Sequence, residues 1–321
     1  MAEVMTHKQA REATIIDEMR RNPDIFFIDR AFNKARVEEF GWEREKYTRS
    51  GINENQMVGA AIGASMAGAR AIAYPHTADY SLDAITQIVV LAAKMHFKLA
   101  YKLPCPAIFW LGWGGVNVKT VHHAGCYHNW MANAPGLFCM VPSMPADAAG
   151  LWRTALCDTK DPTIYMEDRG ASGSKLEELV PDGHKIPFGV ADVKREGNDV
   201  TIAAVGYMVH LALDAAEDLA KEGIDAEVWD PRTLSPFDHE SLVKSVRKTG
   251  AMVAVDQAPK TFGTTGEFTA TVAEAITPVP PMARVATWDV PIGAAPSITD
   301  PIYPSKAKII DAVKGVLARK G

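Results

Sequence analysis

The chain has 321 residues, of which 47% are hydrophobic and 23% charged, a composition typical of a globular protein. Lys and Arg number 34 and Asp and Glu 39, so the sequence lacks the basic excess that is typical of nucleic-acid binding. It also shows no secretory leader, no uninterrupted apolar run of membrane-spanning length, and no CxxC pair among its four cysteines. We therefore expect a cytoplasmic protein of two domains that neither crosses a membrane nor binds nucleic acid.

Helical and strand patterns alternate through the first half of the chain. Helix patterns cover residues 10–21, 54–68, 81–101 and 146–157. Short apolar runs typical of buried strands cover residues 25–28, 69–74, 107–111, 138–141 and 163–166. Strands that alternate with helices favour a parallel sheet with both faces covered. We therefore expect an α/β domain over residues 1–170.

A second alternation follows a glycine-, serine- and charge-rich segment, residues 171–185, which is typical of a linker. Strand patterns lie at residues 200–205, 226–229 and 251–255. Helix patterns lie at residues 209–221 and 238–248. These patterns predict a smaller α/β domain over residues 186–321.

Two groups of polar residues adjoin predicted strands and helices of the first domain. Glu54 begins a helix crowded with Gly and Ala, where free N–H groups stabilise a carboxylate. Segment 76–81 contains His76, Asp79 and Tyr80, and it follows a strand, where parallel sheets bind ligands. Each group has a simpler interpretation, since Glu54 could be an ordinary first-turn residue and Asp79 or Ser81 a helix cap.

The third group is a histidine cluster, which contains His122, His123, Cys126 and His128. Histidine titrates near neutral pH and suits proton transfer, so a catalytic histidine is one interpretation. A zinc site and a purely structural cluster are the alternatives, although the usual zinc spacings are absent. The chain also lacks the dinucleotide, P-loop, zinc-protease and nucleophile-elbow motifs.

Taken together, these pieces resemble the beta subunit of the thiamine-diphosphate-dependent decarboxylating component of 2-oxo acid dehydrogenase complexes, of the pyruvate, branched-chain and acetoin types, in the transketolase-like superfamily. The matching segments are residues 51–54, 59–68, 77–80, 83–88, 230–236 and 289–291, together with His123. The resemblance implies a pyrimidine-binding thiamine-diphosphate fold over residues 1–170 and a transketolase C-terminal-like domain over residues 186–321.

The resemblance also implies that this chain forms only part of an active site. An alpha subunit would hold the cofactor's diphosphate and Mg²⁺ through a Gly-Asp-Gly clamp, in an α2β2 assembly. This chain has no such clamp. A lipoyl acyltransferase is the further partner that the family implies, and the substrate is a small molecule.

Residue roles follow from the same resemblance. Glu54 would hydrogen-bond the aminopyrimidine ring of thiamine diphosphate and favour its imino form, and Tyr80 would pack on that ring. Ile52 and Gln56 are the other expected cofactor-binding residues. His123 would orient or protonate the acyl-derived intermediate. The remaining expectations are a substrate cavity with His76, His122 and Trp113, and a potassium loop with the backbone of Ala155, Leu156 and Asp158.

The expected activity is oxidative decarboxylation of a 2-oxo acid, or an acetoin-type cleavage, with acyl transfer to an acceptor such as a lipoyl group. Two alternatives stay open. One is a split, transketolase-like enzyme that makes or breaks a C–C bond without a lipoyl partner. The other is a non-catalytic scaffold subunit.

Overall fold

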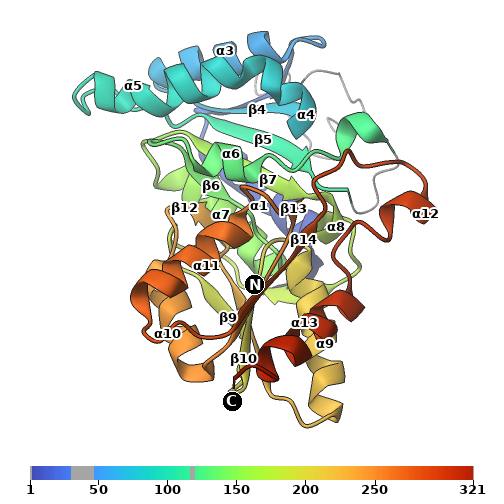
Figure 1. Cartoon of the computed structure of the whole chain (residues 1–321). Coiled ribbons are helices and arrows are strands. Elements are labelled where there is room, and N and C mark those ends of the chain that lie inside the picture. The colour runs from blue at the N-terminus through green and yellow to red at the C-terminus, as the bar shows by residue number, and fades with distance from the viewer. Residues whose placement is uncertain (1, 30–46, 116–119, 321) are drawn as a thin grey trace.

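The protein contains two main β-sheets, each covered by helices (Figure 1). The computed structural model describes residues 2–29, 47–115 and 120–320. The larger sheet has the strand order β12-β6-β7-β5-β4-β2-β3, and the smaller has the order β14-β13-β10-β11-β9. A third, two-stranded sheet joins β1 and β8. In the part of the chain that is described, no helix combines the length and apolar character needed to span a bilayer.

The larger sheet belongs to the first half of the chain. Its strands are β2 (Ile25–Asp29), β3 (Tyr47–Arg49), β4 (Arg70–Thr77), β5 (Ile108–Trp113), β6 (Phe138–Met140) and β7 (Thr163–Asp168), and every neighbouring pair of these is parallel. The helices around it are α1 (His7–Arg21), α3 (Glu54–Met66), α4 (Ala78–Ser81), α5 (Ala93–Lys98), α6 (His128–Ala132), α7 (Pro145–Cys157) and α8 (Arg169–Ser172).

The smaller sheet belongs to the second half. Its strands are β9 (Asp192–Arg195), β10 (Val200–Ala204), β11 (Ala226–Asp230), β13 (Met252–Pro259) and β14 (Met282–Thr287). The helices are α9 (Met208–Lys221), α10 (His239–Thr249), α11 (Thr264–Ala275), α12 (Pro296–Thr299) and α13 (Lys306–Leu317). One short strand, β12 (Thr233–Ser235), crosses over and extends the larger sheet, antiparallel to β6.

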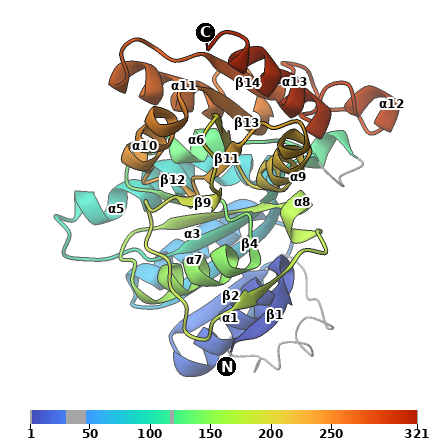
Figure 2. The same ribbon diagram turned by 90° about the horizontal axis from the view of Figure 1, so that it is seen from below.

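Both faces of the larger sheet are buried, which explains why its strands appear in the sequence as continuous apolar runs. In β5, Trp110 packs with residues of α1 and α7, such as Met19 and Trp152. The preceding residue, Phe109, belongs to the opposite core, which contains Met57 of α3. Figure 2 shows α1 and α7 together on one side of this sheet.

The predicted helices and strands agree with the structure within a few residues, with two notable differences. The helix expected over 81–101 is interrupted by 3-10 (Leu82–Ala84) and π-helical (Thr86–Ala92) turns before α5. The segment expected to be a linker, 171–185, contains strand β8 (Glu177–Val180), which pairs antiparallel with β1 (Glu3–Thr6).

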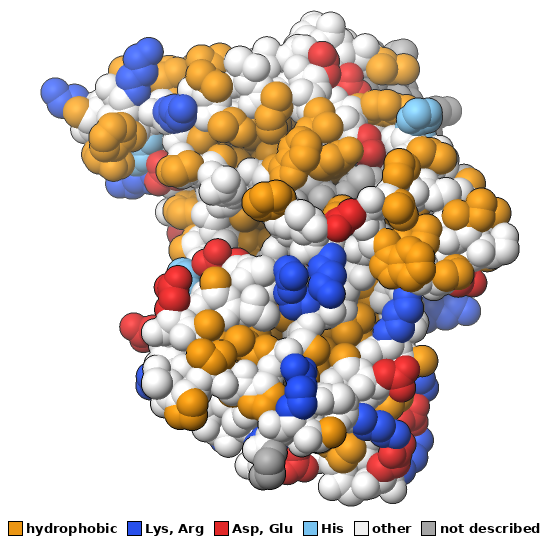
Figure 3. Space-filling model, in the orientation of Figure 1, with side chains coloured by type: hydrophobic (Ala, Val, Ile, Leu, Met, Phe, Trp, Pro, Cys, Tyr) orange, Lys and Arg blue, Asp and Glu red, His pale blue; other side chains and the backbone are white. Residues whose placement is uncertain are grey.

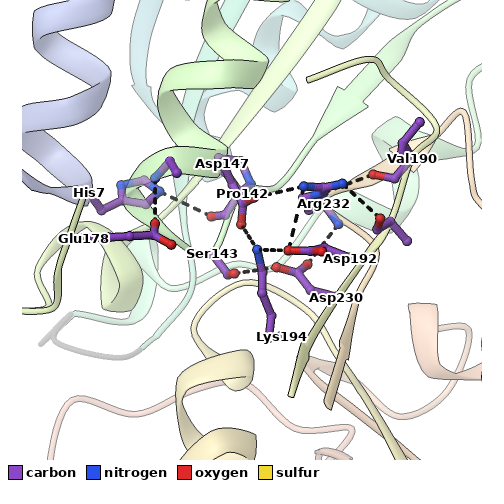
Figure 4. A network of polar contacts seen from close by, with 12 residues as sticks. His7, Pro142, Ser143, Asp147, Glu178, Val190, Asp192, Lys194, Asp230 and Arg232 are labelled. Atoms are coloured by element: carbon purple, nitrogen blue, oxygen red, sulfur yellow. Dashed lines mark hydrogen bonds and ion pairs between the residues drawn. The ribbon is translucent and has the colours of Figure 1, made fainter. Parts of the chain in front are cut away.

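A mostly buried network of charges joins the two domains, with Asp192 at its exposed side (Figure 4). Lys194 Nζ lies 2.6 Å from Asp147 and 2.8 Å from Asp192, and Arg232 Nη1 lies 3.3 Å from Asp147. The fully buried Asp230 carboxylate accepts hydrogen bonds from the Ser143 hydroxyl and from the Arg232 backbone N–H. Burial raises the pKa of Asp230 to about 7, although Lys194 acts in the opposite direction.

Candidate active site at the carboxyl edge of the larger sheet

The parallel strands of the larger sheet end at a common edge. Thr77 at the end of β4 pairs with Gly112 of β5, and Trp113 at the end of β5 pairs with Asp168 of β7. Ligands of parallel sheets bind at the carboxyl ends of the strands. Helices α4 and α8, which begin directly after β4 and β7, lie at this edge (Figure 1).

Glu54 follows β3 at the same edge and is the first residue of α3. The Asn53 side chain caps this helix by accepting a hydrogen bond of 2.8 Å from the Gln56 backbone N–H. The Glu54 side chain is 8% exposed, and it makes no hydrogen bond or ion pair with any residue in the described ranges. Its carboxylate oxygens are not among the enclosed, unpartnered polar atoms of the described residues, so solvent reaches them and the side chain is open to a ligand.

Tyr80 and His123 come together although they lie far apart in the sequence. Their rings meet edge to face, with centroids 5.2 Å apart and an interplanar angle of 83°. Asp79 holds the histidine segment beside α4, because its two carboxylate oxygens accept hydrogen bonds of 3.2 and 3.3 Å from the Gly125 backbone N–H. The half-buried His123 is therefore fixed next to Tyr80.

Arg169 is a further residue at this edge, and the sequence analysis did not identify it. Its guanidinium donates a hydrogen bond to the backbone carbonyl of His123. The available signal was a basic residue directly after a buried strand, at the position where a parallel sheet binds its ligand. The apparent loss of pattern at this point instead suggested the start of a linker.

The other residues expected to bind the cofactor or line the substrate cavity are exposed, except for Trp113, which is buried. Ile52 is 77% exposed, and Gln56 and His122 are also exposed. His76 is exposed, has a left-handed backbone (φ 80°), and stacks on the Tyr74 ring. Trp113 is fully buried, so within the described chain it contributes to the core and not to an open cavity wall.

Within the histidine cluster, Cys126 and His128 are buried, whereas His122 is exposed and His123 half-buried. His128 is fully buried, lies 2.8 Å from the Asp256 carboxylate of β13, and packs against Trp113 with ring centroids 4.1 Å apart. Cys126 is also buried, which raises the pKa of its thiol. The described segments contain no group of three or more His, Cys, Asp or Glu residues arranged to hold a metal ion. The cluster therefore gives the zinc alternative no support.

Backbone carbonyls in and beside the expected potassium loop already accept hydrogen bonds from an arginine side chain. The Arg70 guanidinium donates hydrogen bonds to the backbone carbonyls of Ala155 (3.1 Å), Cys157 (3.3 Å) and Thr159 (2.8 Å). The Thr159 hydroxyl also donates to the Ala155 carbonyl at 2.9 Å, so two donors occupy both lone pairs of that oxygen. The Asp158 carboxylate forms an ion pair with Lys185.

Comparison with known proteins identifies both domains. Residues 3–175 match the transketolase pyrimidine binding domain, and residues 189–309 match the transketolase C-terminal domain. The fold also resembles a solved structure described as a split gene transketolase, inactive beta4 tetramer, with a TM-score of 0.83, 24% identity and 99% coverage of each chain. The expected fold class is therefore confirmed.

Relatives that align with most of this chain define its family more closely. The chain is 34% identical to the 2-oxoisovalerate dehydrogenase subunit beta of Bacillus subtilis, over 84% of this chain and 85% of that one. It is 32% identical to a mitochondrial pyruvate dehydrogenase E1 component subunit beta of Oryza sativa, over 98% and 86%. It is 33% identical to a Cupriavidus necator acetoin:2,6-dichlorophenolindophenol oxidoreductase subunit beta, over 98% of each. The chain belongs to the family of beta subunits of 2-oxo acid dehydrogenase-type decarboxylating components, which confirms the expected resemblance.

Proposed function

We propose that this chain is the beta subunit of a two-component enzyme that oxidatively decarboxylates a 2-oxo acid, or cleaves an acetoin-type ketol, and transfers the acyl group to an acceptor such as a lipoyl group. The observation that carries the proposal is Glu54 at the carboxyl edge of the sheet, a largely buried residue whose carboxylate reaches solvent and has no partner among the described residues. The named activities of the relatives support the reaction class.

The residues present fit thiamine diphosphate. Glu54 would share a proton with a ring nitrogen of the aminopyrimidine, because its carboxylate is accessible and has no partner among the described residues. Tyr80 is 40% exposed, so part of its ring is open to packing, and ring packing contributes about 0.5–1.5 kcal/mol beyond area burial. When bound, the cofactor supplies a nucleophilic carbon and accepts the electron pair left by the departing CO2. The exposed Ile52 and Gln56 would complete the contact once a partner chain covers them.

His123 is the residue that we assign to proton movement on the substrate side. Two contacts fix the backbone around His123: Asp79 accepts a hydrogen bond from the Gly125 N–H, and Arg169 donates one to the His123 carbonyl. Tyr80 packs against the His123 ring. Its imidazole is half-buried, so it retains access to a ligand. Holding a proton donor rigidly beside the reacting group is worth more than the same donor on a mobile loop.

A partner chain is part of the proposal. The outward face of α3 consists of small residues, and a β-carbon added at Gly59 or Gly63 would meet no atom within 4 Å. Apolar side chains also gather over the first domain in Figure 3, and the segment after α4 exposes Val90, Leu91, Phe97 and Tyr101. These features support close contact with other subunits in a cytoplasmic α2β2 assembly, whose alpha subunits carry the Gly-Asp-Gly clamp and Mg²⁺.

Reconstitution tests the proposal. The chain is purified with a partner that carries the clamp, and turnover of 2-oxo acids is followed with an artificial electron acceptor, with and without thiamine diphosphate. Ketol donors with an aldehyde acceptor are assayed in parallel. Turnover of 2-oxo acids that requires the cofactor supports the proposal, turnover of ketol donors alone favours the split transketolase, and no turnover of either favours the scaffold.

A further inference from the structure

A buried pair of side chains joins the histidine segment to the second domain. His128 is the first residue of α6, and its Nε2 lies 2.8 Å from a carboxylate oxygen of Asp256 in β13. The two side chains are 0% and 1% exposed. The other carboxylate oxygen accepts a hydrogen bond of 3.3 Å from the Ala258 backbone N–H. The His128–Asp256 pair therefore ties a helix of the first domain to a strand inside the smaller sheet.

Folding stability alone does not account for this pair. A buried polar pair that includes a charge usually adds no more stability than apolar side chains of similar volume, because both groups lose their hydration. The enclosed Nδ1 of His128 has no hydrogen-bond partner in the part of the chain that the structure describes, which adds to the cost. A hydrogen bond fixes direction as well as distance. The pair is therefore better explained by the orientation that it imposes on α6.

The strand that carries Asp256 is itself held against the carboxyl edge of the larger sheet. The next residue, Gln257, donates a hydrogen bond of 2.7 Å to the buried Asp168 carboxylate at the end of β7. Its backbone carbonyl accepts a hydrogen bond of 2.6 Å from the Thr287 hydroxyl of β14. A β-carbon at Gly114 would lie 3.0 Å from the Gln257 side-chain oxygen, so the two domains are in close contact here. Asp256 is thus a fixed point that determines where His128 lies.

The segment between His128 and His123 is short, since it contains only residues 124–127. Within it, the Gly125 backbone N–H donates a hydrogen bond to Asp79, and the Gly125 carbonyl accepts one of 3.5 Å from the Gly114 N–H. These contacts connect the segment to the ends of β4 and β5 and leave it little freedom. A shift of His128 at the start of α6 would therefore also displace His123.

We propose that His128 and Asp256 are positioning residues that hold His123 in place in the active site. Both side chains are fully buried, so they act through the backbone of residues 124–127 and not by contact with the substrate. The inference rests on the proposed function, because it treats His123 as the residue that moves a proton. It goes beyond that function by giving the second domain a part in aligning the site.

The kinetics of the reconstituted complex test this role. His128→Ala should lower kcat about tenfold or more and leave KM nearly unchanged, because proton transfer to the bound substrate depends on close alignment. His128→Gln should retain more activity than His128→Ala, since its amide can still donate to Asp256. The double variant His128→Ala/Asp256→Ala should lose no more kcat than His128→Ala, because both changes break the same contact. It also removes the carboxylate that His128→Ala leaves buried without a partner, so it keeps the test available if the single variant fails to fold.

His96 offers a matched control. Its Nδ1 lies 2.6 Å from the Asp161 carboxylate, which precedes β7 at the amino end of that strand, opposite to the carboxyl edge. His96→Ala removes a similar contact within the first domain, so it should lower the thermal midpoint and leave kcat at the wild-type value. A wild-type kcat in the double variant, or an equal loss of kcat in His96→Ala, would overturn the inference.

Hydrogen exchange, followed by mass spectrometry, tests the same role without turnover. Peptides that cover residues 121–127 contain the Gly125 N–H, whose bond to Asp79 depends on the position of this segment. In the complex of His128→Ala or of the double variant, they should exchange about tenfold faster than in wild type, whereas peptides of α7 should not change. Exchange of residues 121–127 at the wild-type rate would refute the positioning role. Faster exchange in a complex that turns over no donor would support the interdomain contact and contradict the proposed function alone.

Discussion

Replacement of Asp230 by asparagine tests the charge balance of the network that joins the two domains (Figure 4). Burial raises the pKa of this carboxyl from 3.8 to about 7. Between these values the folded protein binds a proton that the unfolded chain does not bind. Asp230 therefore makes the free energy of unfolding fall as the pH rises through this window. Asparagine cannot ionise, so the variant lacks this component of the pH dependence.

The size of the effect follows from the separation of the two pKa values. A difference of roughly three pKa units corresponds to an upper limit of about 4 kcal/mol at 1.36 kcal/mol per unit. Relative to the wild type, Asp230→Asn should gain up to this amount between about pH 4 and pH 8. Its amide oxygen can still accept the hydrogen bond from the Arg232 backbone N–H, which the carboxylate accepts at 2.9 Å.

The assay is the unfolding midpoint of both proteins in urea at a series of pH values, with the difference between them as the readout. His7 has a pKa lowered to about 3 by burial, so it makes stability fall as the pH drops below 6.5. This opposite slope is common to both proteins and cancels in the difference. Asp192→Asn is the control, because the pKa of Asp192 is lowered and should produce no slope above about pH 5. A gap between Asp230→Asn and wild type that stays constant across the series would refute the reasoning.

Two further predictions concern the arginines Arg11 and Arg70. Against the effect of burial, Arg11 and the Ser172 and Trp110 hydrogen bonds hold the pKa of Glu167 at about 2. Arg11→Met should therefore cost about 3–5 kcal/mol in urea unfolding, and a loss no larger than that of the surface variant Arg21→Met would contradict this. The potassium loop that the resemblance implies at Ala155, Leu156 and Asp158 predicts a higher thermal midpoint in KCl than in NaCl. Equal midpoints would instead indicate that the Arg70 guanidinium is the cation bound to the Ala155, Cys157 and Thr159 carbonyls.

Local patterns predicted the framework because the central strands of both sheets are buried on two faces. Residues 107–111 and 163–166 are apolar without alternation, and the structure places them in β5 and β7 at the centre of the sheet. The strand β8 was missed because its partner β1 lies more than 170 residues away and two of its four residues are glutamates. No local pattern indicates such a pairing.

The sequence also indicated candidate site residues, because they lie next to strand ends or match family motifs. The structure places Glu54, Tyr80 and His123 at the same carboxyl edge, whereas their roles remain proposals. Trp113 could not be placed in this way, since a residue at a strand end can face either the edge or the core, and packing against His128 determines the outcome. Arg169 was missed because its role depends on contacts with two distant segments, at His123 and at Gly112.

The most direct test of the central claim is the exchange rate of the C2 proton of thiamine diphosphate bound to the reconstituted complex in heavy water. Wild type is compared with Glu54→Gln and with Glu240→Gln, a matched first-turn glutamate on the exposed start of α10. If Glu54 activates the cofactor, its variant should slow exchange about 10²-fold or more while the cofactor stays bound and the control exchanges normally. Exchange at the wild-type rate in Glu54→Gln would contradict the claim that this carboxylate works on thiamine diphosphate.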